Sequence, residues 1–268
     1  MELIVGSMAL KLRGAGVGSV PVGERKPIRG FSDSSKRHLL WKLQTLDYDK
    51  LKAEGWTAWF VTLTYRDVFY REYRNLRRAK EDLDRFFIYL SRLMPLDFFS
   101  FWKLEFTRKG IPHFHLFMCV RGNVSHADLI QYVQTAWLLS VSPPGEHLKR
   151  MRRASTNVRF TPLDRVRILA VYISKEIGKT YQVDVSDGEL PGRFWGIYNR
   201  KYYKLYVKED TVELQIAEFY KLRRIFKNWL YSKGYSRRFR GREGLTLYYV
   251  RNVSDLLRAL EVVRDELG

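Results

Sequence analysis

Two kinds of hydrophobic periodicity mark strands and helices in the first part of the chain. Residues 56–65 are mostly aromatic or β-branched, a composition typical of a β-strand. Over residues 75–94, apolar side chains recur every three or four positions, as on one face of a helix, and Pro95 follows directly. These patterns predict a strand over 56–65 and a helix over 75–94.

Further elements follow as far as residue 178. The segment 107–112 contains Gly110 and joins two strand-like runs, which is typical of a β-hairpin. Strands interspersed with helices in this order are typical of an antiparallel sheet with helices packed against it. We therefore predict an α+β fold, whose other elements are a short helix over 39–51, strands over 98–106, 113–120 and 157–162, and helices over 127–139 and 164–178.

The two ends of the chain have a different character. Residues 1–35 are rich in glycine and are expected to form a flexible arm. Residues 36–200 would form the main α+β domain, and residues 201–268 a basic C-terminal α/β extension that serves DNA binding or oligomerisation. In this extension the pattern predicts strands over 202–214 and 245–250 and helices over 216–231 and 254–267.

Composition narrows the range of partners. The chain has 268 residues, with 48 Lys and Arg against 29 Asp and Glu, and a formal net charge of +19. Its hydrophobic fraction of 46% supports a folded core and excludes a disordered basic tail. The positive charge indicates a polyanionic partner, which is nucleic acid, an anionic membrane surface or a polyanionic substrate.

Two further classes are excluded by the sequence. Cys119 is the only cysteine, so the chain has no intramolecular disulfide and no cysteine-based zinc site. Residues 1–12 are too short and too polar for a signal peptide, and no stretch reaches the roughly 18 apolar residues of a membrane span. We therefore expect a protein of the host-cell cytoplasm with no membrane association.

A pair of histidines on a predicted strand is the first candidate for chemistry. His113 and His115 are two residues apart, so their side chains lie on one face, about 7 Å apart along the backbone. A turn centred on Lys109 or Gly110 places Glu105 opposite one of them, on the same face. Two histidines and a carboxylate suit Mn²⁺, Mg²⁺ or Zn²⁺ acting as a Lewis acid. The alternative is a pair of half-buried or surface histidines without a ligand.

A second candidate lies on the predicted helix over 164–178. Tyr172 and Lys175 are three residues apart and share a helical face. A tyrosine beside a lysine can act as a nucleophile, because positive charge stabilises the phenolate. With 17 tyrosines in the chain, such a pair also arises by chance. The pair therefore gains meaning only together with the histidines.

These segments together resemble the motifs of the HUH endonucleases, in particular the single-tyrosine initiators of rolling-circle replication in phages and plasmids. Phe60–Tyr65 (FVTLTY) is similar to the first motif of that family, Pro112–His115 (PHFH) to its metal motif, and Tyr172–Lys175 (YISK) to its nucleophile helix. Gly192–Gly196 (GRFWG) is similar to a stretch found in filamentous-phage-like members. The resemblance covers residues 55–200.

The resemblance implies an HUH/ferredoxin-like Rep fold and a site-specific nickase and strand transferase. Glu105, His113 and His115 would hold Mn²⁺ or Mg²⁺ at the scissile phosphate of single-stranded origin DNA. Tyr172 would attack that phosphate, leaving a free 3′-hydroxyl and a 5′-phosphotyrosine, and Lys175 would stabilise the charge. A host helicase and a polymerase are the implied partners, and the oligomeric state is left open.

Two basic clusters, 149–160 and 221–242, contain no acidic residue and are expected to contact DNA phosphates. Aromatic side chains interleaved in the second cluster suit base stacking. The residues expected to bind DNA are Arg150, Arg152, Arg153, Arg223, Arg224, Lys227, Arg237 and Arg238.

Three other functions are compatible with parts of the sequence. They are a single-tyrosine HUH transposase, a non-catalytic DNA-binding protein and a metal-dependent hydrolase of small molecules. The motif order, with Tyr172 after the histidines, and the presence of Lys175 favour the replication initiators over the transposases. The charge of +19 disfavours a small-molecule substrate.

Overall fold

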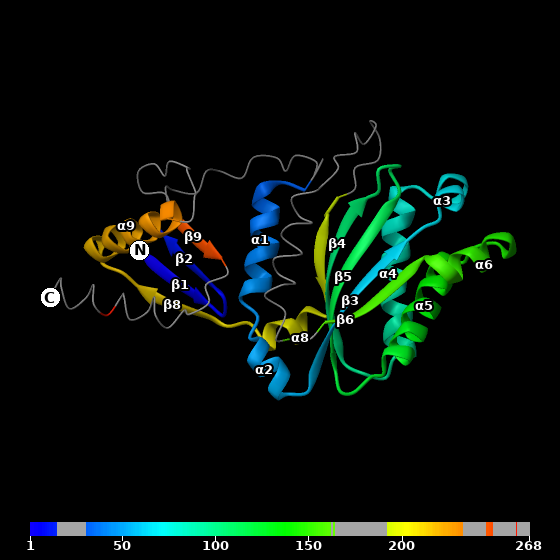
Figure 1. Ribbon diagram of the computed structural model, residues 1–268, viewed down its shortest axis with the longest axis horizontal. Coiled ribbons are helices and arrows are strands. Elements are labelled where there is room, and N and C mark those ends of the chain that lie inside the picture. Colours follow the sequence, from blue (N-terminus) through cyan, green and yellow to red (C-terminus); the bar gives the residue numbers. More distant parts are fainter. Residues whose placement is uncertain (15–30, 162, 164–191, 233–244, 249–260, 262–268) are drawn as a thin grey trace. The chain divides into compact units, whose positions relative to one another are not determined.

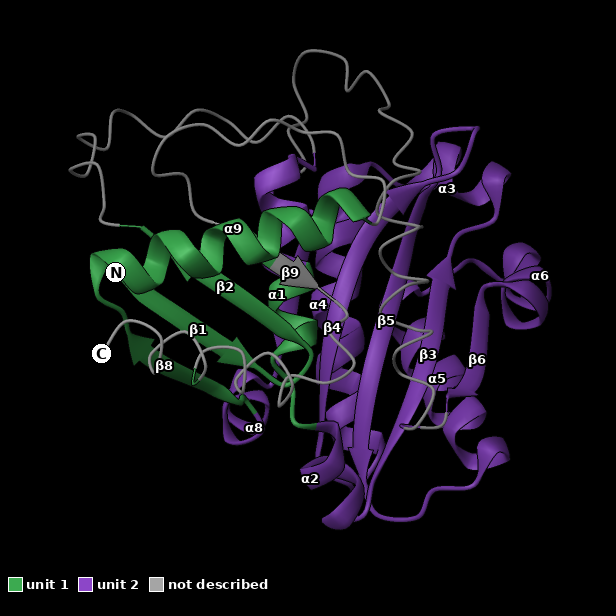
Figure 2. Cartoon of the chain, turned by 60° about the vertical axis from the view of Figure 1, so that its left-hand side comes forward, with its two compact units in different colours: residues 1–25, 40–47, 207–268 green, residues 26–39, 48–206 purple. Residues whose placement is uncertain are grey.

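The computed structural model describes residues 1–14, 31–161, 163, 192–232, 245–248 and 261 (Figure 1). In this part, the chain is a mixed α+β protein whose strands form two antiparallel sheets, which confirms the predicted fold class. It divides into two compact units, coloured in Figure 2. Unit 1 comprises residues 1–25, 40–47 and 207–268, and unit 2 comprises residues 26–39 and 48–206.

Unit 2 is built on a five-stranded sheet with the strand order β6-β3-β5-β4-β7. Every neighbouring pair of strands in this sheet is antiparallel. The strands are β3 (Trp56–Thr64), β4 (Phe98–Phe106), β5 (Pro112–Arg121), β6 (Thr156–Thr161) and β7 (Trp195–Tyr198). The four strands predicted for this region are therefore present, and β7 is an addition.

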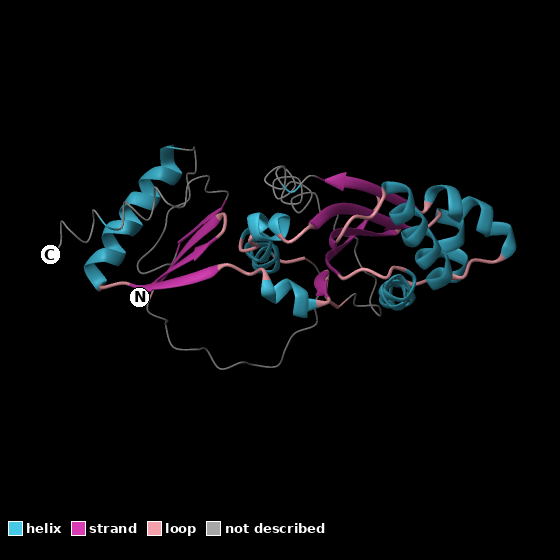
Figure 3. Ribbon diagram, turned by 90° about the horizontal axis from the view of Figure 1, so that it is seen from below, coloured by secondary structure: helices cyan, strands magenta, loops and turns pink. Residues whose placement is uncertain are grey.

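One face of the unit 2 sheet is covered by α4 (Leu76–Leu93) and α5 (His126–Val141), as Figures 1 and 3 show. Trp137 of α5 packs against Phe86 of α4 and Phe114 of β5, with ring centroids 6.1 and 6.4 Å apart. Alternate residues of a strand point to opposite faces. The side chains on the other face of β3 and β5 are only partly buried, so this second face is free to carry polar residues.

Shorter helices complete unit 2, and two of them depart from the sequence prediction. The remaining helices are α2 (Tyr48–Ala53), α3 (Asp67–Tyr73), α6 (Gly145–Ala154) and α8 (Arg200–Leu205), with the first part of α1 (Asp33–Gln44). The single helix predicted over 39–51 is two helices, α1 and α2. The strand predicted over 202–214 is wrong in its first part, where α8 buries Tyr203 against Phe99 and Phe101.

Unit 1 brings the two ends of the chain into one sheet with the order β8-β1-β2-β9. Helix α9 (Ile216–Ser232) packs against it, with Phe219, Leu222 and Phe226 in a core shared with the strands. The strands are β1 (Glu2–Gly6), β2 (Ala9–Arg13), β8 (Glu209–Glu213) and β9 (Leu245–Tyr248).

The prediction of a flexible arm over 1–35 is therefore wrong for residues 2–13. Leu3, Leu10 and Leu12 are each at most 1% exposed and join the core beneath α9. Burial of these side chains stabilises the two strands, although glycines dominate the sequence just after them. The helices predicted over 164–178 and 254–267 fall outside the described residues, and no helix within the described part is long and apolar enough to cross a membrane.

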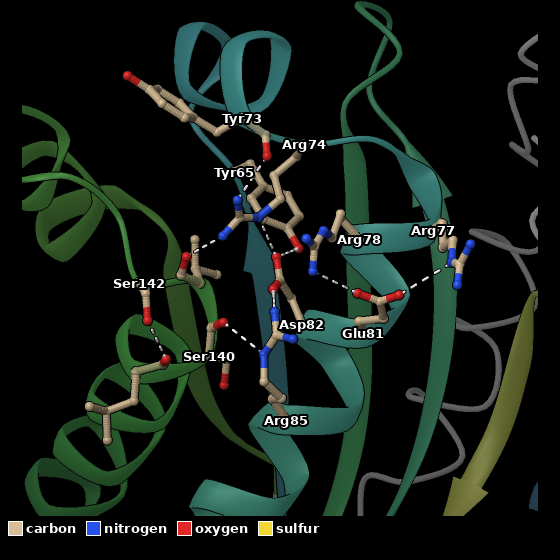
Figure 4. Close-up of polar contacts among 12 residues, drawn as sticks. Tyr65, Tyr73, Arg74, Arg77, Arg78, Glu81, Asp82, Arg85, Ser140 and Ser142 are labelled. Atoms are coloured by element: carbon tan, nitrogen blue, oxygen red, sulfur yellow. Dashed lines mark hydrogen bonds and ion pairs between the residues drawn. The ribbon is translucent and has the colours of Figure 1, made fainter.

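A buried carboxylate ties the end of β3 to the helices of unit 2 (Figure 4). Asp82 of α4 is fully buried, and it accepts hydrogen bonds from the Tyr65 hydroxyl at 2.9 Å and from Arg74 Nε at 2.8 Å. Arg85 forms a further ion pair with Asp82 and donates to the Ser140 carbonyl of α5 at 3.2 Å. Because Tyr65 directly follows Thr64, this network fixes the end of β3.

We expect the Tyr65→Phe variant to lose stability in a pH-dependent manner. Burial, followed by the Asp82 carboxylate, raises the pKa of Tyr65 well above its usual value. The hydroxyl therefore contributes its full stabilisation below about pH 10, where the unfolded chain also keeps the proton, and the contribution falls as pH rises further. Urea unfolding at pH 7 should show a loss of about 1–2 kcal/mol for the variant.

The stability difference between wild type and Tyr65→Phe should narrow when the same measurement is repeated above pH 10. Tyr132→Phe, which changes a half-buried tyrosine of α5, is the matched control. A difference that stays constant from pH 7 to pH 11 would contradict the role given to the Tyr65 hydroxyl.

Candidate active site

The β4–β5 hairpin sets the register of the candidate site. Its turn is closed by the Thr107 amide, which donates to the Ile111 carbonyl at 2.9 Å, and by the Gly110 amide, which donates to Thr107. Gly110 has a φ of +78°, which only glycine adopts at little cost. This turn pairs Glu105 with His113, one of the two partners that the sequence allowed.

Glu105, His113 and His115 share the sheet face that α4 and α5 leave uncovered. The two imidazole rings lie 4.9 Å apart between centroids. The Glu105 carboxylate reaches diagonally across the ladder, and its Oε2 lies 3.2 Å from Nε2 of His115. The structure therefore brings together all three side chains that the sequence proposed as metal ligands.

Two threonines of the neighbouring strand orient the histidines. Thr64 Oγ1 is hydrogen-bonded to Nδ1 of His113 at 2.9 Å, and Thr62 Oγ1 to Nδ1 of His115 at 3.3 Å. In the register of β3 and β5, each threonine lies directly opposite its histidine. Both rings consequently present Nε2 rather than Nδ1 toward Glu105 and the open part of the face, an arrangement that outer hydrogen bonds commonly enforce on metal-binding histidines.

Lys103 is a fourth charged residue of the site. It lies opposite His115 in the strand register and is 5% exposed. Its ammonium forms an ion pair with Oε1 of Glu105. The Phe31 ring covers it, with its centroid 5.5 Å from Nζ. The site therefore holds a buried cation and a carboxylate in direct contact.

The electrostatics of the site favour a charged Glu105 and a neutral His113. Burial alone would raise the pKa of Glu105, but the hydrogen bond with His115 and the charge of Lys103 together lower it below its usual value. Burial and the neighbouring His115 lower the pKa of His113 to about 4, against the opposing effect of Glu105. A neutral imidazole and an ionised carboxylate are the forms that bind a metal ion.

The donor set fits a divalent cation by its chemistry. Two imidazole Nε2 atoms and one carboxylate, with positions left for other ligands, are typical of Mn²⁺, Mg²⁺ or Zn²⁺ centres. Within the residues that the structure describes, however, no group of three His, Cys, Asp or Glu side chains is already gathered as metal ligands are. Glu105 is held instead between Lys103 and His115.

The site lies in one row across the unit 2 sheet, and His115 is the member of that row that the sequence identified as a ligand. The row pairs Asn157 with Thr62, Thr62 with His115, His115 with Lys103, and Lys103 with Trp195. The polar residues Lys103, Thr62 and Thr64 all interrupt apolar strands at every second position, in step with His-x-His. That alternation is the signal that could have identified them.

The predicted nucleophile lies outside the part of the chain that the structure describes. This applies to Tyr172 and Lys175, and equally to Arg237 and Arg238 of the second basic cluster. Their predicted roles therefore stay predictions.

The first basic cluster forms the outer side of α6. Arg150, Arg152 and Arg153 are exposed, whereas His147 and Met151 of the same helix are buried. On α9 of unit 1, Arg224 is exposed and Arg223 and Lys227 are half-buried. Exposed arginines on the outer side of α6 are free to contact phosphates, since the buried side of the helix anchors it to the domain.

Comparison with known proteins gives one family. Residues 58–181 match a family model described as replication-associated protein, of the ORF2 kind. The match supports a replication-initiator family and a role in DNA replication, and it spans the β3–β6 region as well as residues 172 and 175. Comparison with curated proteins and with solved structures finds no match to the chain.

We expect Glu105→Gln to lower the free energy of unfolding by about 3 kcal/mol when a chelator is present, because it removes the carboxylate that is paired with the buried Lys103 ammonium. The double variant Lys103→Met/Glu105→Gln should regain more than half of this loss. Glu81→Gln, which breaks exposed ion pairs with Arg77 and Arg78, should change stability by less than about 1 kcal/mol. A Glu105→Gln variant as stable as wild type would contradict the buried pair.

Proposed function

We propose that the chain is a metal-dependent endonuclease of the HUH type that nicks single-stranded DNA at a replication origin and becomes joined to it through Tyr172. The observation that carries the proposal is the convergence of Glu105, His113 and His115 on one open sheet face, with both histidines oriented by threonines. This face lies inside the segment that matches a replication-associated family.

The residues of the open face have distinct tasks in this mechanism. Glu105 and the Nε2 atoms of His113 and His115 would hold Mn²⁺ or Mg²⁺. A bound divalent ion supplies Lewis-acid polarisation of the scissile phosphate. Thr62 and Thr64 keep the imidazoles in the required orientation, so that little reorganisation is needed when substrate arrives.

Strand cleavage would be carried by the tyrosine. The Tyr172 oxygen attacks the phosphorus, the bond from phosphorus to the 3′-oxygen breaks, and that oxygen leaves as a 3′-hydroxyl after taking up a proton. The 5′-phosphate stays on Tyr172 as an ester, which conserves the bond for later rejoining. Lys175, one turn along the predicted helix, stabilises the phenolate and the developing negative charge.

The basic surface of α6 suits delivery of the strand to this face. Helix α6 leads directly into edge strand β6, where Arg159 is exposed and lies opposite Phe60 of β3. Phe60 in turn stacks on His115, with ring centroids 5.5 Å apart. A strand bound along α6 and β6 would therefore meet side chains next to the site. An origin bound in the host cytoplasm and later extended by a host helicase and polymerase completes the proposed role.

The nucleophile is tested by covalent capture. Full-length protein incubated with origin-like single-stranded DNA and Mn²⁺ should give a protein–DNA adduct that resists denaturing electrophoresis. Tyr172→Phe should abolish it, and the double variant His113→Ala/His115→Ala should reduce it by at least about a hundredfold, since the metal ligands are lost. Tyr73→Phe, an exposed tyrosine of α3, is the control and should react as wild type does.

Either of two results would overturn this assignment. Adduct formation by Tyr172→Phe would exclude that residue as the nucleophile. Tight binding of DNA by wild type without any Mn²⁺-dependent cleavage would identify the protein as a non-catalytic DNA-binding protein.

The contribution of α6 is tested by the salt dependence of binding. Replacing Arg150, Arg152 and Arg153 together by Gln should flatten the slope of log affinity against log salt concentration by about 2, since each phosphate contact to a single strand contributes about 0.7. Fluorescence anisotropy with labelled single-stranded DNA measures this slope. Arg77→Gln, on the outer side of α4, should leave the slope unchanged. An unaltered slope in the triple variant would remove α6 from the DNA path.

A further inference from the structure

Lys103 is the residue of the site that the proposed mechanism does not use. Its side chain is 6% exposed, and burial of an ammonium ion is costly unless an opposite charge lies beside it. Glu105, two residues along the same strand, supplies an opposite charge. His115 and Trp195 flank Lys103 on the neighbouring strands, and Phe31 covers it. A lysine needed only for solubility would not be enclosed in this way.

Both oxygens of the Glu105 carboxylate are already engaged. Oε1 is paired with the ammonium of Lys103, and Oε2 lies 3.2 Å from Nε2 of His115. A divalent ion held by Glu105 and the two histidines needs one of these oxygens and the same Nε2 atom. Lys103 and such an ion are therefore rivals for one carboxylate, within a site where burial leaves their mutual repulsion weakly screened.

We propose that Lys103 acts as an internal competitor of the metal, so that its ammonium occupies Glu105 in the DNA-free protein and weakens the binding of divalent ions there. The proposal rests on the metal centre of the proposed function. Loading of the ion requires the Lys103 ammonium to withdraw from Glu105. The lysine therefore sets the metal concentration at which the site becomes competent, separately from the ligands that define the site.

The proposal explains two features of the site together. The donor residues share one face and have the orientation of metal ligands, yet they are not gathered around a common point within the described residues. A resident cation on Glu105 accounts for this, because the carboxylate is drawn toward the ammonium. The lowered pKa of Glu105 is consistent with this position beside His115 and Lys103.

The test is a titration of the DNA-free, full-length protein with Mn²⁺, followed by calorimetry or by the electron paramagnetic resonance signal of free Mn²⁺. Lys103→Met removes the charge at similar length, whereas Lys103→Arg keeps it. The Met variant should bind Mn²⁺ at least about tenfold more tightly than wild type, and the Arg variant within about threefold of it. Each protein is also prepared with His115→Ala, which should abolish the binding in every background.

Two further measurements keep the result independent of folding. Lys103→Gln, whose amide can still donate a hydrogen bond to Glu105, should bind Mn²⁺ more tightly in the same way. Added Mn²⁺ should raise the Tm of Lys103→Met by more than it raises that of wild type, since tighter binding to the folded state alone gives a larger shift.

The outcomes separate the two levels of the argument. If wild type binds Mn²⁺ in a His115-dependent manner and neither Lys103→Met nor Lys103→Gln binds it more tightly, the competitor role is wrong and the metal centre stands. If none of the proteins shows His115-dependent binding, the metal centre is wrong, and the competitor role falls with it.

Discussion

The antiparallel register of β3, β4 and β5 is the constraint on which the candidate site depends. In this register Thr64 lies opposite His113, Thr62 opposite His115, and Glu105 opposite His113 on the other side. A shift of one residue would turn every one of these side chains toward α4 and α5, where buried apolar residues now lie. The apolar set on the helix-covered face therefore holds the polar set in place, and folding and site geometry are one problem.

The end of β3 is held from the helix side as well. The indole nitrogen of Trp137 donates a hydrogen bond to the Thr64 carbonyl at 3.1 Å, and Tyr65 is bound to the buried Asp82. Thr64 thus has its backbone fixed by α5 and the adjacent residue fixed by α4, while its side chain orients His113. Packing beneath the sheet is in this way transmitted to the face above it.

The sequence predicted the parts of the molecule whose pattern is local. The helix at 75–94, the β4–β5 hairpin and the shared face of Glu105, His113 and His115 follow from periodicity and turn chemistry. It did not predict that residues 2–13 pair with β8, because Leu3 and Val212 meet across more than two hundred residues and leave no local signal. It also overlooked Lys103, since burial of a lysine depends on partners such as Phe31 that only the fold brings near.

The central claim is that Glu105, His113 and His115 bind one divalent ion. The most direct measurement is a crystal structure of the full-length protein with Mn²⁺, in which anomalous scattering locates the metal. The account predicts one anomalous peak about 2.2 Å from both Nε2 atoms and from a Glu105 oxygen, with Lys103 withdrawn from that carboxylate. A structure at saturating Mn²⁺ in which Lys103 still holds Glu105 and no peak lies beside the two histidines would contradict it.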